Sequence, residues 1–389
     1  MKKGKRLLTL LLAVGMTLGV VGCAKLPMPG VGADELAGTS YSPTITARQG
    51  HTIALLGGDI YQFASNYTLE SANKYAVGDY ATTNRYAPKP ARLTWENSRE
   101  GALYYTVKVG READLSDAEI YVVNDTKVDV EYLFAAKKYY YQIYAHYEGD
   151  EVVKSRIFDF KTADLPRTVW IEGVSNTRDL GGRLTVDGKH RMKQGIVYRG
   201  GEVDASWGAI TEEGKRVMLY ELGIKTDLDL REGNRKVSPI DASLNFINVS
   251  APYYVGKNGI NDESYKEALT TEIRTFANPD NYPIYLHCSL GRDRAGTLSF
   301  LLSALCGVGK EDLYRDYEMS HFSVNGWAEA AQNPGLHASN MAALNSLWIF
   351  LQNYGTGTLK ENTEAFCINY LGITKAEIES IRSIMLEEV

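Results

Sequence analysis

The stretch that decides the fold is YLHCSLGRDRAGT, residues 285–297. The apolar run from Pro283 to His287 predicts a buried strand. After the stretch, leucines from Leu298 to Leu305 repeat at helical spacing, and Gly307 ends the predicted helix. Residues 288–294 are therefore predicted to form a loop between a strand and a helix, with cysteine at one end and arginine at the other.

A loop of this kind has the geometry of a phosphate site. Its backbone N–H groups and the positive end of the following helix converge on one point, and Gly291 lets the chain curl without a Cβ clash. The positive field favours the thiolate of Cys288, which is the nucleophilic form. The planar fork of Arg294 suits two phosphate oxygens. The alternative is a buried structural thiol followed by a surface arginine, but among the four cysteines only Cys288 has arginine six positions later.

The loop resembles the signature of the cysteine-dependent protein tyrosine phosphatase superfamily. Residues 176–182, 198–201, 229–231 and 316–320 surround it in an order that resembles bacterial tyrosine and lipid phosphatases of dual specificity. The resemblance runs from about Val174 to the C-terminus. It implies hydrolysis of phosphomonoesters through a cysteinyl-phosphate, without metal or other cofactor. Phosphotyrosine, other phosphoproteins, phosphoinositides and inositol phosphates are the substrates that it implies.

The resemblance also implies roles for individual residues. Cys288 would attack phosphorus, Arg294 would stabilise the phosphoryl oxygens, and Asp293 would protonate the leaving oxygen, since no Trp-Pro-Asp loop occurs. The alternative for Asp293 is a helix cap, and Asp179 and Asp229 are the next candidates for the acid, although each is more typical of a residue that braces a turn. The other predicted phosphate-binding residues are Ser289, Leu290, Gly291, Arg292 and Ala295, and the supporting residues are His287, Arg178, Asp179 and Asp229.

Two positions depart from the usual loop of these phosphatases, HCxxGKDRTG. Arg292 replaces lysine and would still bind a second anionic group, with different geometry. Ala295 replaces the hydroxyl residue that normally helps the sulfur to leave, so a phosphate-binding or docking module with little or no turnover is the alternative function. No metal site is predicted, because the histidines are scattered and no paired Cys-x-x-Cys occurs. We expect His287 to tune the thiolate by hydrogen bonding.

The N-terminus has the layout of a bacterial lipoprotein signal. Basic residues precede an apolar run from Leu7 to Val21, which is short for a membrane span. The following Gly22-Cys23 resembles a lipoprotein cleavage site, with Cys23 as the lipidated residue; an ordinary secretory signal is the alternative. We therefore expect residues 1–22 to be a signal peptide, residues 23–47 to be a tether, and the protein to be extracytoplasmic and anchored to the bacterial cell membrane.

Two domains are predicted after the tether. Residues 48–163 contain short alternating runs that predict an all-β, immunoglobulin-like sandwich. Trp95, Leu133 and Tyr139 resemble core and corner positions of a fibronectin type III domain, which would serve as a spacer or dock to a surface partner. Residues 164–389 alternate strands and helices. This pattern predicts an α/β phosphatase domain, with a central, mainly parallel sheet flanked by helices.

Helix starts are predicted in the second domain at three caps, Thr211, Ser264 and Thr374. The net charge of −6 over 389 residues gives no overall attraction to nucleic acid, so nucleic acid is not an expected partner.

Overall fold

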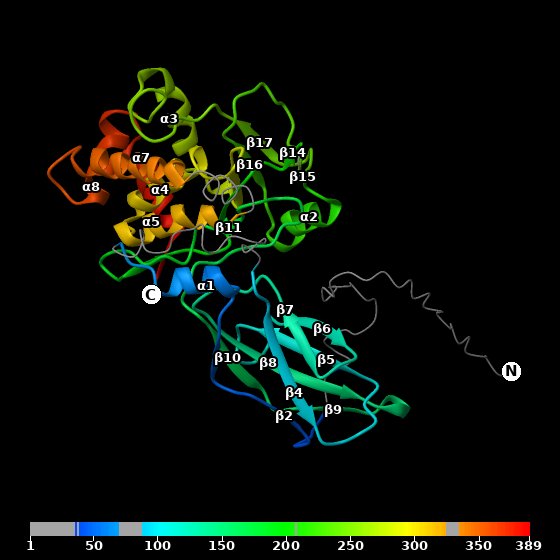
Figure 1. The fold of residues 1–389 in the computed structure, drawn as a ribbon. Coiled ribbons are helices and arrows are strands. Elements are labelled where there is room, and N and C mark those ends of the chain that lie inside the picture. The colour runs from blue at the N-terminus through cyan, green and yellow to red at the C-terminus, as the bar shows by residue number, and fades with distance from the viewer. Residues whose placement is uncertain (1–35, 37–38, 70–87, 207, 324–333) are drawn as a thin grey trace.

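The structure is a computed structural model that describes Leu36 and residues 39–69, 88–206, 208–323 and 334–389. The predicted signal peptide, Cys23 and most of the predicted tether lie outside these residues. Figure 1 shows a part rich in helices above a part made mostly of strands. We name the strand-rich part the β unit (residues 39–57 and 88–163) and the other part the α/β unit (residues 164–389). Among the described residues, no helix has both the length and the apolar character to cross a membrane.

The strands of the β unit form two sheets around one core. One sheet has the order β2-β4-β7; in the other, β8 pairs with β5, β9 and β10, and β6 lies beyond β5. Alternation along β4 buries Leu93 and Trp95, as the sequence predicts for Trp95, against Val107 and Phe160. The strands are β1 (Ser40–Tyr41), β2 (Ile45–Ala47), β3 (His51–Ile53), β4 (Ala91–Asn97), β5 (Tyr104–Gly110), β6 (Glu119–Val123), β7 (Lys127–Val130), β8 (Lys138–His146), β9 (Val152–Lys154) and β10 (Phe158–Thr162).

Strand structure begins earlier than predicted. β1 pairs with β9, with Ser40 opposite Val153, and β2 pairs with β4. The prediction of a tether up to residue 47 is therefore wrong from Ser40 onward, because the backbone there takes part in the sheet ladders. Segments of two and three residues are too short for alternation to reveal them in the sequence.

One helix from the N-terminal half packs with the α/β unit. This helix, α1 (Gly58–Ser65), contributes Ile60 and Phe63 to the core of the α/β unit. The ring centroids of Phe63 and Phe322 are 4.9 Å apart, and α1 lies between the two parts in Figure 1. The predicted boundary at residue 163/164 therefore does not separate the two packing units. The helix α1 precedes that boundary in the sequence but is buried in the core of the unit that follows it.

Five strands form the central sheet of the α/β unit, in the order β11-β13-β18-β16-β17. All pairings are parallel except that of the edge strand β11 with β13. Every residue of β13, β16 and β18 is buried, as expected for parallel strands covered on both faces. The predicted mainly parallel sheet flanked by helices is confirmed. The strands are β11 (Arg178–Asp179), β13 (Val197–Gly200), β16 (Thr226–Asp229), β17 (Asn245–Asn248) and β18 (Ile284–His287).

Helices cover this sheet, and α4, which follows β18, is buried along its length after its first residue. A small pair of strands, β12 (His190–Met192) and β19 (Leu386–Glu388), joins the C-terminus to the unit. The α-helices are α2 (Glu212–Arg216), α3 (Lys266–Thr275), α4 (Arg294–Cys306), α5 (Lys310–Met319), α7 (Pro334–Gln352), α8 (Leu359–Asn369) and α9 (Lys375–Met385).

Two of the three predicted caps are confirmed. Thr211 accepts a hydrogen bond from the Gly214 N–H, and Thr374 forms a capping box with Glu377. The prediction for Ser264 is wrong, because the Asp262 carboxylate accepts from the Ser264 N–H and caps a short 3₁₀ turn that leads into α3. Aspartate is as good a cap as serine, so the turn starts two residues earlier.

The two units meet around the buried side chain of Arg167. Its guanidinium donates to the backbone carbonyls of Leu133 (2.9 Å) and Tyr132 (2.7 Å) in the β unit. It also pairs with Asp179 of the α/β unit at 2.8 Å and lies over the Phe134 ring. One buried cation is thus bonded to both units, which fixes their relative orientation.

Candidate active site

The phosphate loop lies at the C-terminal end of β18, the middle strand of the sheet. Cys288 follows β18 directly, and α4 begins at Arg294 with Asp293 in the N-cap position. A pocket of about 310 Å³ opens over the loop, and its lining residues are Tyr253, Cys288, Ser289, Leu290, Asp293 and Arg294. The predicted nucleophile and its arginine therefore share one cavity. Cys288 is 4% exposed.

Glycines allow the loop to lie against the next strand. Gly291 has a φ of +68°, in the left-handed region that favours glycine. A Cβ at this position would lie 2.4 Å from the carbonyl of Gly200. A Cβ on Gly201 would likewise meet the Ser175 hydroxyl at 2.7 Å. Gly291 is thus required by its close approach to the backbone of Gly200.

The two arginines of the loop have different surroundings. Arg294 has no hydrogen-bond or ion-pair partner among the described residues, and it lines the pocket. The Arg292 side chain is only 7% exposed and contacts Asp293, with Nε 3.1 Å from Oδ1 and Nη2 3.3 Å from Oδ2. The expectation that Arg292 binds a second anionic group is therefore not supported, because its guanidinium already contacts the carboxylate of Asp293.

Asp293 does not cap α4 with its side chain. Its carboxylate is 30% exposed, lines the pocket, and accepts a hydrogen bond of 2.5 Å from the Tyr254 hydroxyl. The capping alternative for Asp293 is thus excluded. Tyr254 was not predicted as a site residue, because nothing in the sequence shows that residues 253–254 reach the loop.

The other two candidates for the acid are buried away from the pocket. Asp179 has no exposed surface; it accepts from the N–H groups of Gly181 and Gly195 and pairs with Arg167. Asp229 is also buried and pairs with Arg231 at 2.7 Å. Burial opposes ionisation of Asp229, but its contacts with Arg231 hold its pKa below the usual range. Both aspartates brace the structure, as the sequence indicates.

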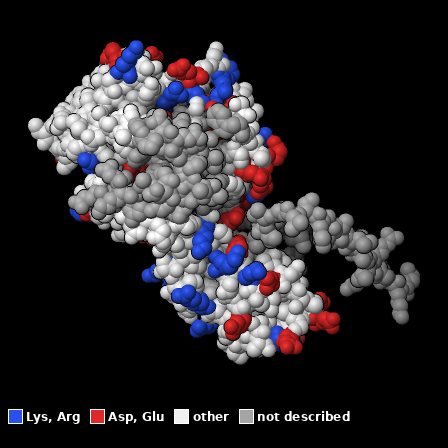
Figure 2. All heavy atoms as spheres, in the orientation of Figure 1, with Lys and Arg blue, Asp and Glu red and all other residues white. Residues whose placement is uncertain are grey.

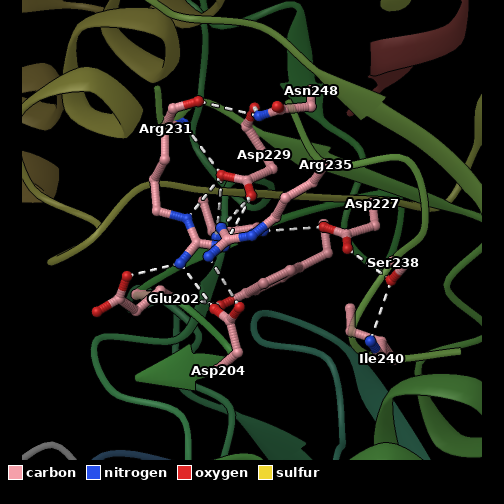
Figure 3. Close-up of polar contacts among 12 residues, drawn as sticks. Glu202, Asp204, Asp227, Asp229, Arg231, Arg235, Ser238, Ile240 and Asn248 are labelled. Carbon is pink, nitrogen blue, oxygen red and sulfur yellow. Dashed lines mark hydrogen bonds and ion pairs between the residues drawn. The ribbon is translucent and has the colours of Figure 1, made fainter. Parts of the chain in front are cut away.

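Figure 3 shows the charged cluster around Asp229. Arg231 contacts Glu202, Asp204 and Asp229 at 2.6–2.7 Å. The Glu202 N–H donates to the Ser289 carbonyl of the phosphate loop at 3.2 Å. The cluster therefore holds the loop from behind.

His287 lies between two carboxylates on β16. Its Nε2 is 3.0 Å from Asp227 Oδ1 and its Nδ1 is 4.0 Å from Asp229 Oδ1, and all three side chains are fully buried. Neither contact has the alignment of a hydrogen bond. No group of three or more His, Cys, Asp or Glu side chains in the described part of the chain is placed to hold a metal ion.

A second support of the loop centres on Asp316, at the end of α5. Three buried arginines reach its carboxylate at 2.5–2.8 Å, namely Arg178, Arg183 and Arg199. Burial opposes ionisation of Asp316, but the three guanidinium groups hold its pKa far below the usual range.

Two of these arginines connect Asp316 to the phosphate loop through hydrogen bonds. Arg199 donates to the Gly291 carbonyl at 2.6 Å. Arg178 bonds Asn176, which in turn donates to the Leu290 carbonyl at 2.9 Å. The predicted supporting residue Arg178 therefore acts through Asn176. Arg183 was not predicted, and residues 316–320 were noted only as part of the resemblance.

Two other cysteines lie in the described part of the chain. Burial raises the pKa of Cys306 and of Cys367 to about 12, so both stay as thiols.

Ala295 is fully buried at the start of α4, and the hydroxyl of the nearby Thr297 accepts from the Tyr254 N–H. The Thr297 hydroxyl thus ties α4 to the segment that carries Tyr254.

Comparison with known proteins agrees with this site. Residues 169–387, more than half of the chain, match the tyrosine phosphatase family. A Cupriavidus necator protein with the provisional name of a tyrosine-protein phosphatase is 25% identical in an alignment 244 residues long, which covers 51% of this chain and 86% of that protein.

Two solved structures align with lower similarity. The core catalytic domain of the PP-IP phosphatase Siw14 from S. cerevisiae, in complex with citrate, is 19% identical, covers 46% of this chain and 93% of that one, and has a TM-score of 0.29. A second structure of the Siw14 catalytic core is 18% identical, covers 46% and 90% of the two chains, and has a TM-score of 0.28. The family match and the Cys288 loop together lead to one conclusion: the protein belongs to the tyrosine phosphatase family and is a phosphomonoester hydrolase.

Proposed function

We propose that the enzyme hydrolyses phosphate monoesters through a cysteinyl-phosphate on Cys288. The observation that carries the proposal is that Cys288, Asp293 and Arg294 line one open pocket, with the Arg294 guanidinium unpaired among the described residues. An unpaired guanidinium beside a nucleophile is preorganised to bind the oxygens of a phosphoryl group.

In the first step the Cys288 thiolate attacks phosphorus and the ester P–O bond breaks. Asp293 gives its proton to the leaving oxygen, so that the product leaves as a neutral alcohol or phenol. Arg294 and the loop N–H groups stabilise the equatorial oxygens. In the second step Asp293 takes a proton from water, the water oxygen bonds to phosphorus, and the P–S bond breaks to release inorganic phosphate and the thiolate.

Among the substrates that the resemblance implies, we propose phosphotyrosine in a protein or peptide. Tyr253 is the aromatic side chain that lines the pocket, 37% exposed beside Cys288, and it offers a face to an aryl leaving group. Arg294 is the only arginine or lysine among the described lining residues. One cation suits a single phosphate better than the several phosphates of an inositol polyphosphate.

The test compares phosphate release from a phosphotyrosyl peptide and from inositol hexakisphosphate, without added metal. We expect kcat/KM for the peptide to be higher by about tenfold or more. Faster release from the inositol phosphate would overturn the substrate proposal alone. Binding of the peptide with no phosphate released would favour the alternative function, a phosphate-binding module, in which Ala295 leaves the sulfur without a donor.

We propose that the β unit is a fibronectin type III-like sandwich that docks to a surface partner. The strand order β2-β4-β7 opposite β6-β5-β8-β10 supports this. So does the Tyr139 hydroxyl, which accepts from the Phe134 N–H at 2.8 Å, five residues upstream, as in a tyrosine corner. Figure 2 shows acidic and basic side chains interspersed over this unit, which suits a protein surface better than an anionic polymer.

We propose that Cys23 carries lipid and anchors the enzyme outside the cytoplasm of a bacterial cell. The basic residues and the apolar run Leu7 to Val21 before Gly22-Cys23 support this. Changing Cys23 to alanine is expected to move the protein from the membrane fraction to the soluble fraction, as judged by immunoblotting after cell fractionation. A wild-type protein that is already soluble would contradict the anchor.

A further inference from the structure

We propose that Tyr254 is a positioning residue for the acid, holding the Asp293 carboxyl group toward the leaving group, with Tyr317 as its support. The inference rests on the proposed role of Asp293. It concerns a residue outside the loop motif, on the segment between β17 and α3.

The contacts of the two tyrosines define a chain of hydrogen bonds. The Tyr254 hydroxyl donates to Asp293 Oδ1 at 2.5 Å, and the Tyr317 hydroxyl contacts the Tyr254 hydroxyl. A phenol has one proton to donate, so when Tyr254 donates to Asp293, Tyr317 is the donor to Tyr254. Burial raises the pKa of both tyrosines above the usual range, which keeps both phenols protonated.

The backbone holds Tyr254 in an unusual conformation. Its φ is +56°, a left-handed value that is uncommon for a bulky residue. Such conformations persist only where the surroundings determine them, and they cluster at functional sites. Here the Tyr254 N–H donates to the Thr297 hydroxyl at 2.9 Å and the Tyr254 carbonyl accepts from the Ile260 N–H at 2.9 Å. Because Thr297 is in the first turn of α4, which starts after Asp293, the tyrosine and the acid keep a fixed separation.

The geometry gives the two carboxylate oxygens of Asp293 different surroundings. Oδ1 accepts from Tyr254 at 2.5 Å and lies 3.1 Å from Arg292 Nε. Oδ2 has a contact of 3.3 Å with Arg292 Nη2. Oδ1 thus accepts the shortest of these bonds, and Oδ2, which has only the longer contact with Arg292, is the oxygen that carries the transferred proton.

The experiment measures kcat/KM for a series of aryl phosphates with leaving groups of different acidity, because kcat/KM reports the first step alone and not the hydrolysis step in which Asp293 is the base. Phenyl phosphate needs the acid, because phenol has a pKa of about 10, whereas 2,4-dinitrophenolate leaves without a proton. For Tyr254→Phe we expect kcat/KM to fall about tenfold on phenyl phosphate, the effect of losing one hydrogen bond to a charged group. On 2,4-dinitrophenyl phosphate kcat/KM should stay almost unchanged. Tyr317→Phe should show the same selectivity with a smaller loss.

Tyr314→Phe is the matched control, because it removes another buried tyrosine hydroxyl from the same helix as Tyr317, one that bonds Asn345 at 2.9 Å. It should leave the dependence on the leaving group unchanged. The Asp293→Asn variant provides the reference, and adding Tyr254→Phe to it should cause no further selective loss.

The outcomes separate the inference from the proposed function. An equal loss on all substrates for Tyr254→Phe, with a selective loss for Asp293→Asn, would overturn the positioning role and leave the acid in place. An equal loss on all substrates for Asp293→Asn itself would remove the acid role, and the inference with it.

Discussion

Changing Cys288 to serine is expected to lower kcat on an aryl phosphate by about 10³-fold or more. In the proposed mechanism the thiolate is both the attacking group and the group that leaves phosphorus in the second step, and a serine hydroxyl is a weak nucleophile without an adjacent base. No histidine or carboxylate of the described chain lines the pocket except Asp293, which is assigned to the leaving oxygen. Serine therefore has no base to activate it.

The measurement is steady-state phosphate release by purified wild type and variant, with vanadate binding to show that the loop remains folded. Cys367→Ala is the control, because Cys367 is a buried thiol of α8 that is distant in sequence and function from the loop. It should retain most of the wild-type rate. Wild-type activity in a pure preparation of Cys288→Ser would rule out the covalent mechanism.

Changing Asp316 to asparagine is expected to destabilise the protein by about 3–5 kcal/mol, the usual cost of removing one partner from a buried ion pair. Arg178, Arg183 and Arg199 would all lose their carboxylate. Because Arg199 also holds the Gly291 carbonyl, the phosphate loop should loosen and kcat should fall with stability.

Urea unfolding at neutral pH measures this change in the free energy of unfolding. Asp164→Asn is the control: its partner Arg191 is at 2.7 Å, but Asp164 is 57% exposed, so about 1 kcal/mol or less is expected. Acid should reduce the difference between wild type and Asp316→Asn. The folded-state pKa of Asp316 is depressed, so its contribution is complete above the unfolded pKa of about 4 and is lost as pH falls below it. Equal unfolding free energies at pH 7 would show that the arginines find other partners.

Local sequence alone was sufficient to predict the loop and its frame. Residues within about one helical turn or one strand of each other are enough to predict three elements: the strand that ends at His287, the loop to Arg294 and the helix that ends before Gly307. The same holds for the caps at Thr211 and Thr374, where the donor is three residues from the acceptor. Such features need no knowledge of the rest of the chain.

Asp262 shows where local rules were ambiguous. Two good capping residues stand two positions apart, and both patterns satisfy the same rule. In the structure the aspartate caps the 3₁₀ turn at Glu263–Tyr265, which leads directly into α3. The helix α1 was not predicted, since residues 48–163 were assigned to an all-β domain, and only the position of the α/β core explains why Ile60 and Phe63 are apolar.

The sequence by itself determined that Cys288 and Arg294 share one loop and that this loop follows a central strand. Only the tertiary structure decided which charged residues support the loop through hydrogen bonds and ion pairs and which face the substrate pocket. Arg292 and Arg294 are two positions apart and chemically identical, yet one contacts Asp293 and the other faces the pocket. Tyr254 and Arg199 contact the loop from 39 and 92 residues away in the sequence, and Asp316 supports it through Arg199. The reason is physical: a buried charge needs a partner in space, and neither composition nor periodicity records which distant segment supplies it.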